Sequence, residues 1–285
     1  MKVSEEDIHI ATKDFLVSGE EFSLVRNSKF GFLETRPQPN EEDLPQYYES
    51  DEYISHSDSK SGVMAFLYQA VKKRSLKKKV KLIQRLHSGK GSLLDIGAGT
   101  GAFLKLAKEK GWKISGVEPN SKARALANEK KISLSKSIDQ LSGQQFDVIS
   151  LWHVLEHLPN LELTIQKIVN LLKEDGVLVI AVPNYNSSDA KYYKTHWAAY
   201  DVPRHLWHFS QQSMVQLFSS ECDLKKIKPM IFDSFYVSLL SEKYKTGKGF
   251  SMRAFFIGLW SNIRAWRTTE YSSLIYCFKK SKFGN

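Results

Sequence analysis

The sequence predicts an α/β protein whose core is a doubly wound, mostly parallel β-sheet. Two observations support this prediction. After Gly91, short apolar runs alternate with amphipathic stretches of helical length. A glycine-rich turn, GAGTGA at Gly97–Ala102, follows directly after the first of these runs. Strands that alternate with helices in this way usually form a parallel sheet with helices on both of its faces.

The predicted elements follow one another in chain order from this first strand. Strands are read from short runs rich in Leu, Val and Ile, and helices from apolar residues at helical spacing with a glycine near the end. In order they are the strand SLLDIG, the helix AFLKLAKEKGW, the strand KISGVEP, the helix SKARALANEKK, the strand FDVISLW, the helix LELTIQKIVNLLKEDG and the strand VLVIAVP.

The chain before the sheet is divided into two smaller parts. Residues 1–40 alternate weakly between apolar and polar side chains, which predicts a small β-hairpin extension that ends at the turn RPQPN. Residues 41–88 have a helical pattern and are predicted to form a cap. The main domain is expected to span residues 89–285, with a helical insertion at about 233–267.

The net charge of +10 does not by itself indicate a nucleic-acid partner. Much of the excess lies in KKRSLKKKVK, Lys72–Lys81, where seven basic residues occur without an acidic one. This run fits the solvated face of a helix that places Val71, Leu76, Val80 and Ile83 inward. We therefore predict no nucleic-acid partner.

Cysteine usage and hydropathy predict a soluble, cytoplasmic protein. The only two cysteines, Cys222 and Cys277, lack CxxC spacing, which disfavours a disulfide framework or a cysteine zinc site. The N-terminus is too polar for a signal peptide, and no apolar run reaches the roughly 18 residues that a membrane-spanning helix needs.

Two kinds of nucleotide site fit the glycine-rich turn. Gly97–Ala102 satisfies the dinucleotide pattern G-x-G-x-x-G/A, and Glu118 lies near the position of an acid that would bind a ribose. The same turn also reads D-x-G-x-G-x-G from Asp95 to Gly101, with an acid before the first glycine that a dinucleotide site does not need. In either site, glycines let the backbone turn sharply and approach a ligand closely.

The second pattern resembles motif I of the class I S-adenosylmethionine-dependent methyltransferases. FDVISLWHVLEHLPN and LLKEDGVLVIAVPN are similar to the segments around the fourth and fifth strands of this family, particularly in its ubiquinone-biosynthesis-like branch. The resemblance covers about residues 89–185. It implies a Rossmann-like sheet of seven strands, mostly parallel with the last one antiparallel, in which Leu224–Phe232 and Ser273–Lys280 supply the final two strands.

The resemblance also implies S-adenosylmethionine as the cofactor. Asp95 would contact the methionine moiety, and Glu118 would accept hydrogen bonds from both ribose hydroxyls. The loop at Ser137–Ile138 would lie near the adenine, with Trp152 beside it. The predicted cofactor site consists of Asp95, Gly97, Ala98, Gly99, Gly101, Glu118, Pro119, Ser137, Ile138 and Trp152.

His153-x-x-Glu156-His157 also matches the H-x-x-E-H pattern of a zinc peptidase. No downstream segment stands out as the source of a third ligand, and the resemblance places this stretch in a loop over the transferred methyl group. In some similar O-methyltransferases an acid at position 153 is thought to hold a divalent metal together with the glutamate and the histidine. Because His153 replaces that acid, no metal site is predicted. Glu156 and His157 could instead orient the loop.

The catalytic candidates are His153, His157 and His205. His205 lies in YDVPRHLWHFS, Tyr200–Ser210, which concentrates two histidines, an arginine and an aspartate around a proline. A histidine can act as a general base when a hydroxyl is methylated. We interpret His205 as a base or a substrate contact, with a structural hydrogen-bonding role as the alternative.

These residues predict an enzyme that transfers a methyl group to a small-molecule or lipid-linked acceptor, at an oxygen atom. The alternative is a non-catalytic protein that keeps the cofactor fold as a binding or scaffolding module. Asp95, the glycines and Glu118 are intact, which favours the enzyme. Where DNA amino-methyltransferases carry their motif after the fourth strand, this chain has LWHV, which disfavours a nucleobase acceptor.

The N-terminal segment LVRNSKFGFLETRP is faintly similar to half of a small zinc ribbon. Asn27 and Phe30 occupy the positions of the cysteines, and without thiolates no zinc can be held there. We therefore expect a metal-free hairpin packed on the core. The helices after it, with Tyr47, Tyr48 and Tyr53 among their residues, are expected to cover the cofactor.

The insertion at 233–267 combines aromatic and basic residues. Its aromatic stripe could pack on the sheet edge or line the acceptor pocket, as in a helical cap. It could instead form an interfacial helix that makes peripheral membrane contact with anionic headgroups. The apolar residues at helical spacing are Phe255, Phe256, Leu259, Trp260, Ile263 and Trp266.

Overall fold

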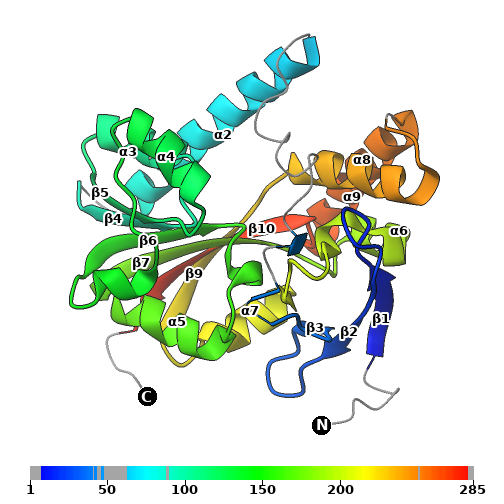
Figure 1. Cartoon of the computed structure of the whole chain (residues 1–285), viewed down its shortest axis with the longest axis horizontal. Coiled ribbons are helices and arrows are strands. Elements are labelled where there is room, and N and C mark those ends of the chain that lie inside the picture. The colour runs from blue at the N-terminus through cyan, green and yellow to red at the C-terminus, as the bar shows by residue number, and fades with distance from the viewer. Residues whose placement is uncertain are drawn as a thin grey trace.

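A six-stranded β-sheet forms the centre of the described structure (Figure 1). The computed structural model describes residues 8–40, 42–43, 46–47, 63–87, 90–249 and 251–281. The strands lie in the order β5 (Lys113–Val117), β4 (Ser92–Ile96), β6 (Phe146–Trp152), β7 (Leu172–Pro183), β10 (Ser273–Lys280) and β9 (Cys222–Pro229). The first four are parallel, and β10 is antiparallel to both of its neighbours. The predicted α/β class and the antiparallel last strand are confirmed.

The described sheet has six strands, one fewer than expected. At its β5 edge, Ser135 makes a single parallel bridge with Val117, and its N–H donates to the Gly116 carbonyl. The chain then enters the short 3-10 helix η3 (Ile138–Leu141). Strand pairing at this edge is therefore reduced to one bridge.

Helices cover both faces of the sheet because apolar side chains of adjacent strand residues point to opposite sides. Leu93 belongs to a buried cluster that includes side chains of α2 (Val63–Leu86), α3 (Ala102–Glu109) and α4 (Ser121–Glu129). Leu94 belongs to a second cluster on the other face, with side chains of α5 (Leu161–Asn170) and α7 (Gln211–Phe218).

The basic helix α2 packs as its sequence predicts. Val80 and Ile83 are buried against the sheet, and Leu76 packs beside them, while Lys77 and Lys78 are exposed. The run of positive charge is therefore mostly a solvated face. Lys79 is the exception described below.

The N-terminal extension forms a second, antiparallel sheet. Its strands are β1 (Ile8–Lys13), β2 (Glu21–Arg26) and β3 (Leu33–Arg36), and a fourth strand, β8 (Trp207–His208), comes from the segment after β7. Asn27 closes the β2–β3 turn, where its side chain accepts the N–H groups of Lys29 and Phe30. The extension is thus joined to the main body by strand pairing. Tyr48 and Tyr53, expected over the cofactor, lie outside the described residues.

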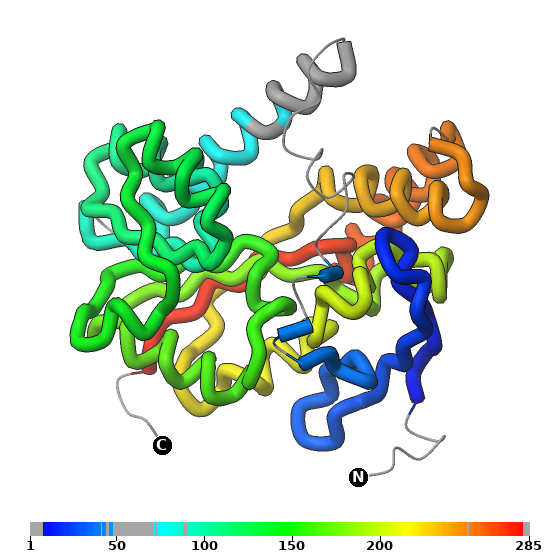
Figure 2. The backbone as a smooth tube through the Cα atoms, viewed as in Figure 1, coloured from blue at the N-terminus to red at the C-terminus, as the bar shows by residue number. Residues whose placement is uncertain are grey.

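A hairpin of two helices, α8 (Asp233–Thr246) and α9 (Met252–Thr268), separates β9 from β10. It lies at the end of the molecule away from α3 and α4 (Figure 2). The buried positions of α9 are small or polar, and a Cβ on Gly258 would lie 2.9 Å from the Ser234 carbonyl, so the two helices are in close contact. Most of the large apolar side chains of α9 point outward, with Trp266 75% and Phe256 58% exposed, whereas Ile257 packs against a buried cluster. Of the two alternatives for this stripe, inward packing on the sheet edge is therefore wrong.

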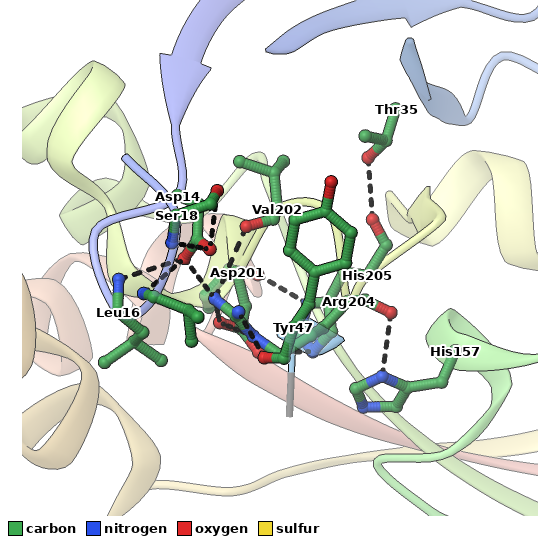
Figure 3. A network of polar contacts seen from close by, with 12 residues as sticks. Asp14, Leu16, Ser18, Thr35, Tyr47, His157, Asp201, Val202, Arg204 and His205 are labelled. Carbon is green, nitrogen blue, oxygen red and sulfur yellow. Dashed lines mark hydrogen bonds and ion pairs between the residues drawn. The ribbon is translucent and has the colours of Figure 1, made fainter. Parts of the chain in front are cut away.

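A buried arginine joins the N-terminal extension to the segment before β8 (Figure 3). Arg204 donates to the carboxylates of Asp14 (2.8 Å) and Asp201 (2.8 and 2.9 Å) and to the carbonyl of Tyr47 (2.9 Å). The side chains of Arg204 and Asp14 are 1% and 0% exposed. Burial disfavours the charged form of Asp14, but hydrogen bonds from Arg204 and from backbone N–H groups hold its pKa below the usual value. Removal of Arg204 would leave the buried Asp14 carboxylate without its cation, whereas removal of Asp14 would leave Arg204 paired with Asp201 alone.

We expect Arg204→Ala to lower the free energy of unfolding by about 3–5 kcal/mol, because it leaves Asp14 without its cation. Denaturant titration followed by circular dichroism measures this. Lys225→Ala removes an exposed partner of Asp223 and should change the value by less than about 1 kcal/mol. Because the pKa of Asp14 is lowered in the folded state, its contribution is present at neutral pH and is lost as the pH falls below 3.8. Equal, small effects of the two substitutions would contradict this anchoring role.

Candidate functional site

The glycine-rich turn links β4 to α3 and has the tight geometry that its sequence predicts. The N–H groups of Gly97 and Ala98 both donate to the Val117 carbonyl, at 2.8 and 2.9 Å. Gly97 has a φ of 71°, and a Cβ there would lie 2.3 Å from the Val154 side chain. Only glycine fits this position, because any other residue would meet both backbone strain and a clash.

The two following glycines also adopt left-handed conformations. Gly101, with φ of 71°, precedes α3, and a Cβ there would press on Ala127 and Ile132 at 3.1–3.2 Å. Gly99, with φ of 53°, is different, because no atom lies within 4 Å of a Cβ built there. Gly97 and Gly101 thus serve packing, whereas Gly99 borders open space.

Glu118, directly after β5, closes the turn from the other side. Its carboxylate accepts the N–H of Gly99 at 2.8 Å and that of Asn120 at 2.9 Å. The two bonds fix the side chain beside the glycine turn while each oxygen retains a lone pair. This is compatible with the predicted contact to ribose hydroxyls.

Asp95 lies at the carboxyl end of β4 and is buried. Ser150 of β6 donates its hydroxyl to Asp95 Oδ1 at 2.6 Å. Burial raises the pKa of Asp95 to about 7, although the Ser150 hydrogen bond and the positive charge of Lys79 oppose this. The Lys79 ammonium lies 4.4 Å from the ring centroid of Trp152. The positive charge of Lys79 thus favours the ionised form of Asp95.

The remaining predicted cofactor residues lie after neighbouring parallel strands. Pro119 follows β5 and is exposed, Ser137 and Ile138 follow the Ser135 bridge, and Trp152 ends β6. Ile138 packs against the core, and Trp152 packs edge-on against Phe103. Since the carboxyl ends of parallel strands share one edge of the sheet, the fold brings these residues to the same side as the glycine turn.

His153 begins the second group of candidate residues. It has a left-handed φ of 57°, which its N–H contact with the Ala181 carbonyl helps to fix. Its Nε2 lies 3.1 Å from Asp233 of α8 and its Nδ1 3.4 Å from Glu156. Burial lowers the pKa of His153, but these two carboxylates outweigh it and raise the pKa to about 9. His153 is therefore a cation at neutral pH and cannot accept a proton.

His157 and His205 lie together beside Glu156. Their rings meet edge to face with centroids 4.6 Å apart. His157 Nδ1 donates to the Arg204 carbonyl (Figure 3) and His205 Nδ1 to the Ala199 carbonyl, both at 2.9 Å. Burial and the neighbouring His157 lower the pKa of His205 to about 4, so that His205 is neutral at physiological pH. Glu156, His157 and His205 each offer an atom within 4.8 Å of the others, a spacing at which they could hold a metal ion.

The structure therefore brings the three predicted catalytic histidines into one region. Three contributors were missed by sequence reasoning. Asp233 was treated as the start of an insertion, Lys79 as part of a solvated run, and Ser150 as an ordinary strand residue. Ser150 carries a usable signal, because it is a polar residue within the apolar run VISLW of its strand.

A family profile described as a methyltransferase domain matches residues 68–227, which is more than half of the chain. The chain belongs to this methyltransferase family. The matched region contains the glycine turn, Glu118 and all three candidate histidines. The family match therefore disfavours both the dinucleotide-site and the zinc-peptidase interpretations of these motifs.

Sequence relatives point in the same direction. An uncharacterized methyltransferase of Staphylococcus carnosus (strain TM300) is 31% identical over 109 residues, or 36% of this chain and 53% of the relative. A ubiquinone biosynthesis O-methyltransferase of Glaesserella parasuis serovar 5 (strain SH0165) is 31% identical over 106 residues, or 32% and 45% of the two chains. The chain thus spans about half the length of the curated relatives it matches.

Solved structures support the fold. The magnesium protoporphyrin IX methyltransferase of Synechocystis PCC 6803 with bound S-adenosylhomocysteine matches with a TM-score of 0.56 and 12% identity, over 85% of this chain and 100% of that one. The StiE O-methyltransferase matches with a TM-score of 0.54 and 16% identity, over 81% of each chain. Together with the family match, these findings show a methyltransferase domain with a Rossmann-like fold. Within the described residues, no helix has the length and apolarity required to span a membrane.

Proposed function

We propose that this methyltransferase transfers the methyl group of S-adenosylmethionine to an oxygen atom of a small-molecule or lipid-linked acceptor. The observation that carries the proposal is the proximity of two groups of residues at the carboxyl ends of the parallel strands. The glycine turn with Asp95 and Glu118 would bind the cofactor. The histidines after β6 would face the acceptor.

Each cofactor residue has a role that follows from its contacts. Asp95, which is tuned between neutral and ionised forms, would receive the ammonium of the methionine moiety. Glu118, held by the N–H groups of Gly99 and Asn120, would accept the ribose hydroxyls. Gly99 would allow the ligand to approach the backbone. The loop at Ser137–Ile138 and Trp152 would flank the adenine.

Transfer to a hydroxyl is an in-line displacement. The carbon–sulfur bond of the sulfonium breaks, a carbon–oxygen bond forms, and the hydroxyl gives up its proton. The protein must hold the reacting atoms in line, exclude water and help to remove that proton. Among the three histidines, neutral His205 suits the last task better than cationic His153, which is held by Asp233 and Glu156. His157 would support His205 through their edge-to-face contact.

An oxygen acceptor is supported by the relatives named ubiquinone biosynthesis O-methyltransferases and by the histidine group, because a sulfur or amine nucleophile has less need of a base. The alternative, a non-catalytic cofactor-fold scaffold, would not require neutral His205 beside a buried acid. Calorimetry with S-adenosylhomocysteine separates the two, since a degenerate scaffold should show no micromolar binding.

The outer surface of α9 supports peripheral membrane contact as a second part of the proposal. Seven large apolar side chains of this helix are at least 37% exposed: Met252, Phe255, Phe256, Leu259, Trp260, Ile263 and Trp266. Arg253, Arg264 and Arg267 lie on the same helix, which has no acidic residue. Apolar insertion and attraction to anionic headgroups would act together on such a surface. A lipid-linked acceptor would then reach the site from the bilayer.

Substitution of Gly99 tests the cofactor site. Gly99→Val should lower the affinity for S-adenosylhomocysteine by about tenfold or more, because the branched side chain would fill the space beside the turn. Gly143→Val is the matched control. Gly143 also has a positive φ (81°) and no atom within 4 Å of a built Cβ, but it lies in the turn before β6. Titration calorimetry compares the two. Unchanged affinity in Gly99→Val would remove the turn from the site.

Substitution of His205 tests the acceptor side. His205→Ala should reduce methyl transfer by about 100-fold or more, as expected for loss of a proton acceptor, and change cofactor affinity by less than about threefold. The assay follows a labelled methyl group from S-adenosylmethionine into phenols and extracted lipids. Equal losses of transfer and of cofactor affinity would mean that His205 is structural.

Membrane contact is tested with vesicles. The chain should co-sediment with phosphatidylglycerol vesicles at low salt and less at high salt, where surface charges are screened. The double substitution Phe256→Ser with Trp266→Ser should weaken binding by about tenfold or more through lost apolar insertion. Leu163→Ser removes an equally exposed apolar side chain on α5 and should have no effect. Absence of binding at low salt would contradict peripheral membrane contact.

A further inference from the structure

Glu156, His157 and His205 form a compact group of metal-ligating side chains, here called the Glu-His-His cluster. Glu156 and His157 belong to the 3-10 helix η4 (Leu155–His157), and His205 belongs to the segment between η6 (Ala198–Tyr200) and β8. The Leu206 N–H donates to the Glu156 carbonyl at 2.8 Å, which ties the two segments together. One ligand atom from each side chain lies within 4.8 Å of the other two.

Both imidazoles are oriented by backbone carbonyls. The Nδ1 of His157 donates to the Arg204 carbonyl and the Nδ1 of His205 to the Ala199 carbonyl. These bonds place the proton on Nδ1 and the lone pair on Nε2 of each ring. A histidine that ligates a metal nearly always donates its other ring N–H to such an oriented acceptor. The backbone therefore presets both rings for ligation through Nε2.

The carboxylate of Glu156 provides a second, independent observation. Its side chain is 1% exposed, and neither oxygen has a hydrogen-bond partner among the described residues. Its nearest cation is His153, whose Nδ1 lies 3.4 Å away, beyond ordinary hydrogen-bond length for a charged pair. A buried carboxylate is costly unless it is bonded or coordinates a metal. The cluster thus contains a buried carboxylate whose oxygens keep lone pairs that a metal ion could use.

We propose that the Glu-His-His cluster binds one divalent transition-metal ion through His157 Nε2, His205 Nε2 and a carboxylate oxygen of Glu156. Two imidazoles and one carboxylate suit zinc and similar ions, whereas magnesium prefers oxygen ligands. Tetrahedral ligands at metal–ligand distances of about 2.1 Å lie about 3.4 Å apart, so the side chains must draw together by about 1 Å. His153 is excluded as a ligand because both of its ring nitrogens face carboxylates, Nε2 that of Asp233 at 3.1 Å and Nδ1 that of Glu156 at 3.4 Å.

This ligand set differs from that of the similar O-methyltransferases. In those proteins an acid at position 153 is thought to be the third ligand, and its replacement by His153 was the reason that the sequence predicted no metal site. Here the third ligand is His205, from a segment 48 residues after His157. The replacement of an oxygen ligand by imidazole would also shift the ion preference from magnesium toward zinc.

The role of the metal ion in methyl transfer rests on the proposed function. Three protein ligands leave a coordination position open, and a metal ion there lowers the pKa of a bound hydroxyl. The acceptor hydroxyl would then release its proton to solvent water before methyl transfer. In the ion-bound form His205 would act as a ligand in place of its role as proton acceptor, because the metal uses its Nε2 lone pair. Binding of the ion itself requires no methyl transfer and can be measured alone.

The test is equilibrium dialysis of the full chain after removal of metals with a chelator. Dialysis against Zn²⁺ should give one ion per chain, and Mg²⁺ at the same concentration should give none. His205→Ala should weaken zinc binding by about 100-fold or more, since even residues that only orient a ligand contribute up to that factor. Co²⁺ gives a second readout, because a visible absorption band reports its coordination by nitrogen and oxygen.

Two further variants keep the outcome interpretable. His196→Ala removes a histidine that packs against Phe15, outside the cluster, and should retain full zinc affinity. Glu156→Gln preserves side-chain volume and removes the charge, and it should lose affinity as His205→Ala does; circular dichroism checks that each variant is folded.

Failure of zinc to bind, or binding that is undiminished in folded His205→Ala and Glu156→Gln, would overturn the metal proposal. Methyl transfer would still proceed in that case if the proposed function is right. Conversely, stoichiometric zinc without transfer to any acceptor would leave the metal site intact and count against the proposed function.

Discussion

The buried ion pair between Arg204 and Asp14 is the interaction on which the arrangement of the site depends. Arg204 reaches through the protein interior to a carboxylate 190 residues earlier in the chain and to Asp201 on its own segment. Its carbonyl meanwhile accepts the Nδ1 proton of His157. The same residue therefore fixes the N-terminal extension with its side chain and a candidate catalytic ring with its backbone. Loss of the ion pair would therefore affect the position of both the N-terminal extension and the His157 ring.

The N-terminal sheet is consequently part of the site's scaffold rather than an appendage. Thr35 of β3 donates its hydroxyl to the His205 carbonyl at 2.6 Å and contacts the His208 ring at 2.9 Å. β8 extends the N-terminal sheet and is also the end of the segment that carries His205. The extension therefore helps to hold the histidine segment in place.

The parts of this protein that were predictable from sequence are those set by local pattern. Alternating apolar runs gave the order of strands and helices, and the spacing of glycines after Asp95 gave the turn, because steric demands on φ act within a few residues. The predicted seventh strand is absent from the described sheet. Pairing at an open sheet edge depends on the position at which the preceding helix ends, which local sequence pattern does not determine. The aromatic stripe of α9 was read with the right helical period, but period does not reveal which side faces the protein. Small residues such as Gly258 on the other side decide that, through close contact with α8.

Long-range electrostatics could not be predicted, since no motif links Asp233 or Lys79 to the histidine and glycine segments. Yet Asp233 determines the state of His153: without this carboxylate, only the more distant Glu156 would oppose the effect of burial on the His153 pKa. Asp233 is also the first residue of α8, which packs closely against α9. The exposed aromatic surface and the strand-end loop are therefore connected through one short helix. A shift of α8 when α9 meets another surface would change the His153–Asp233 distance directly, and with it the charge beside Glu156.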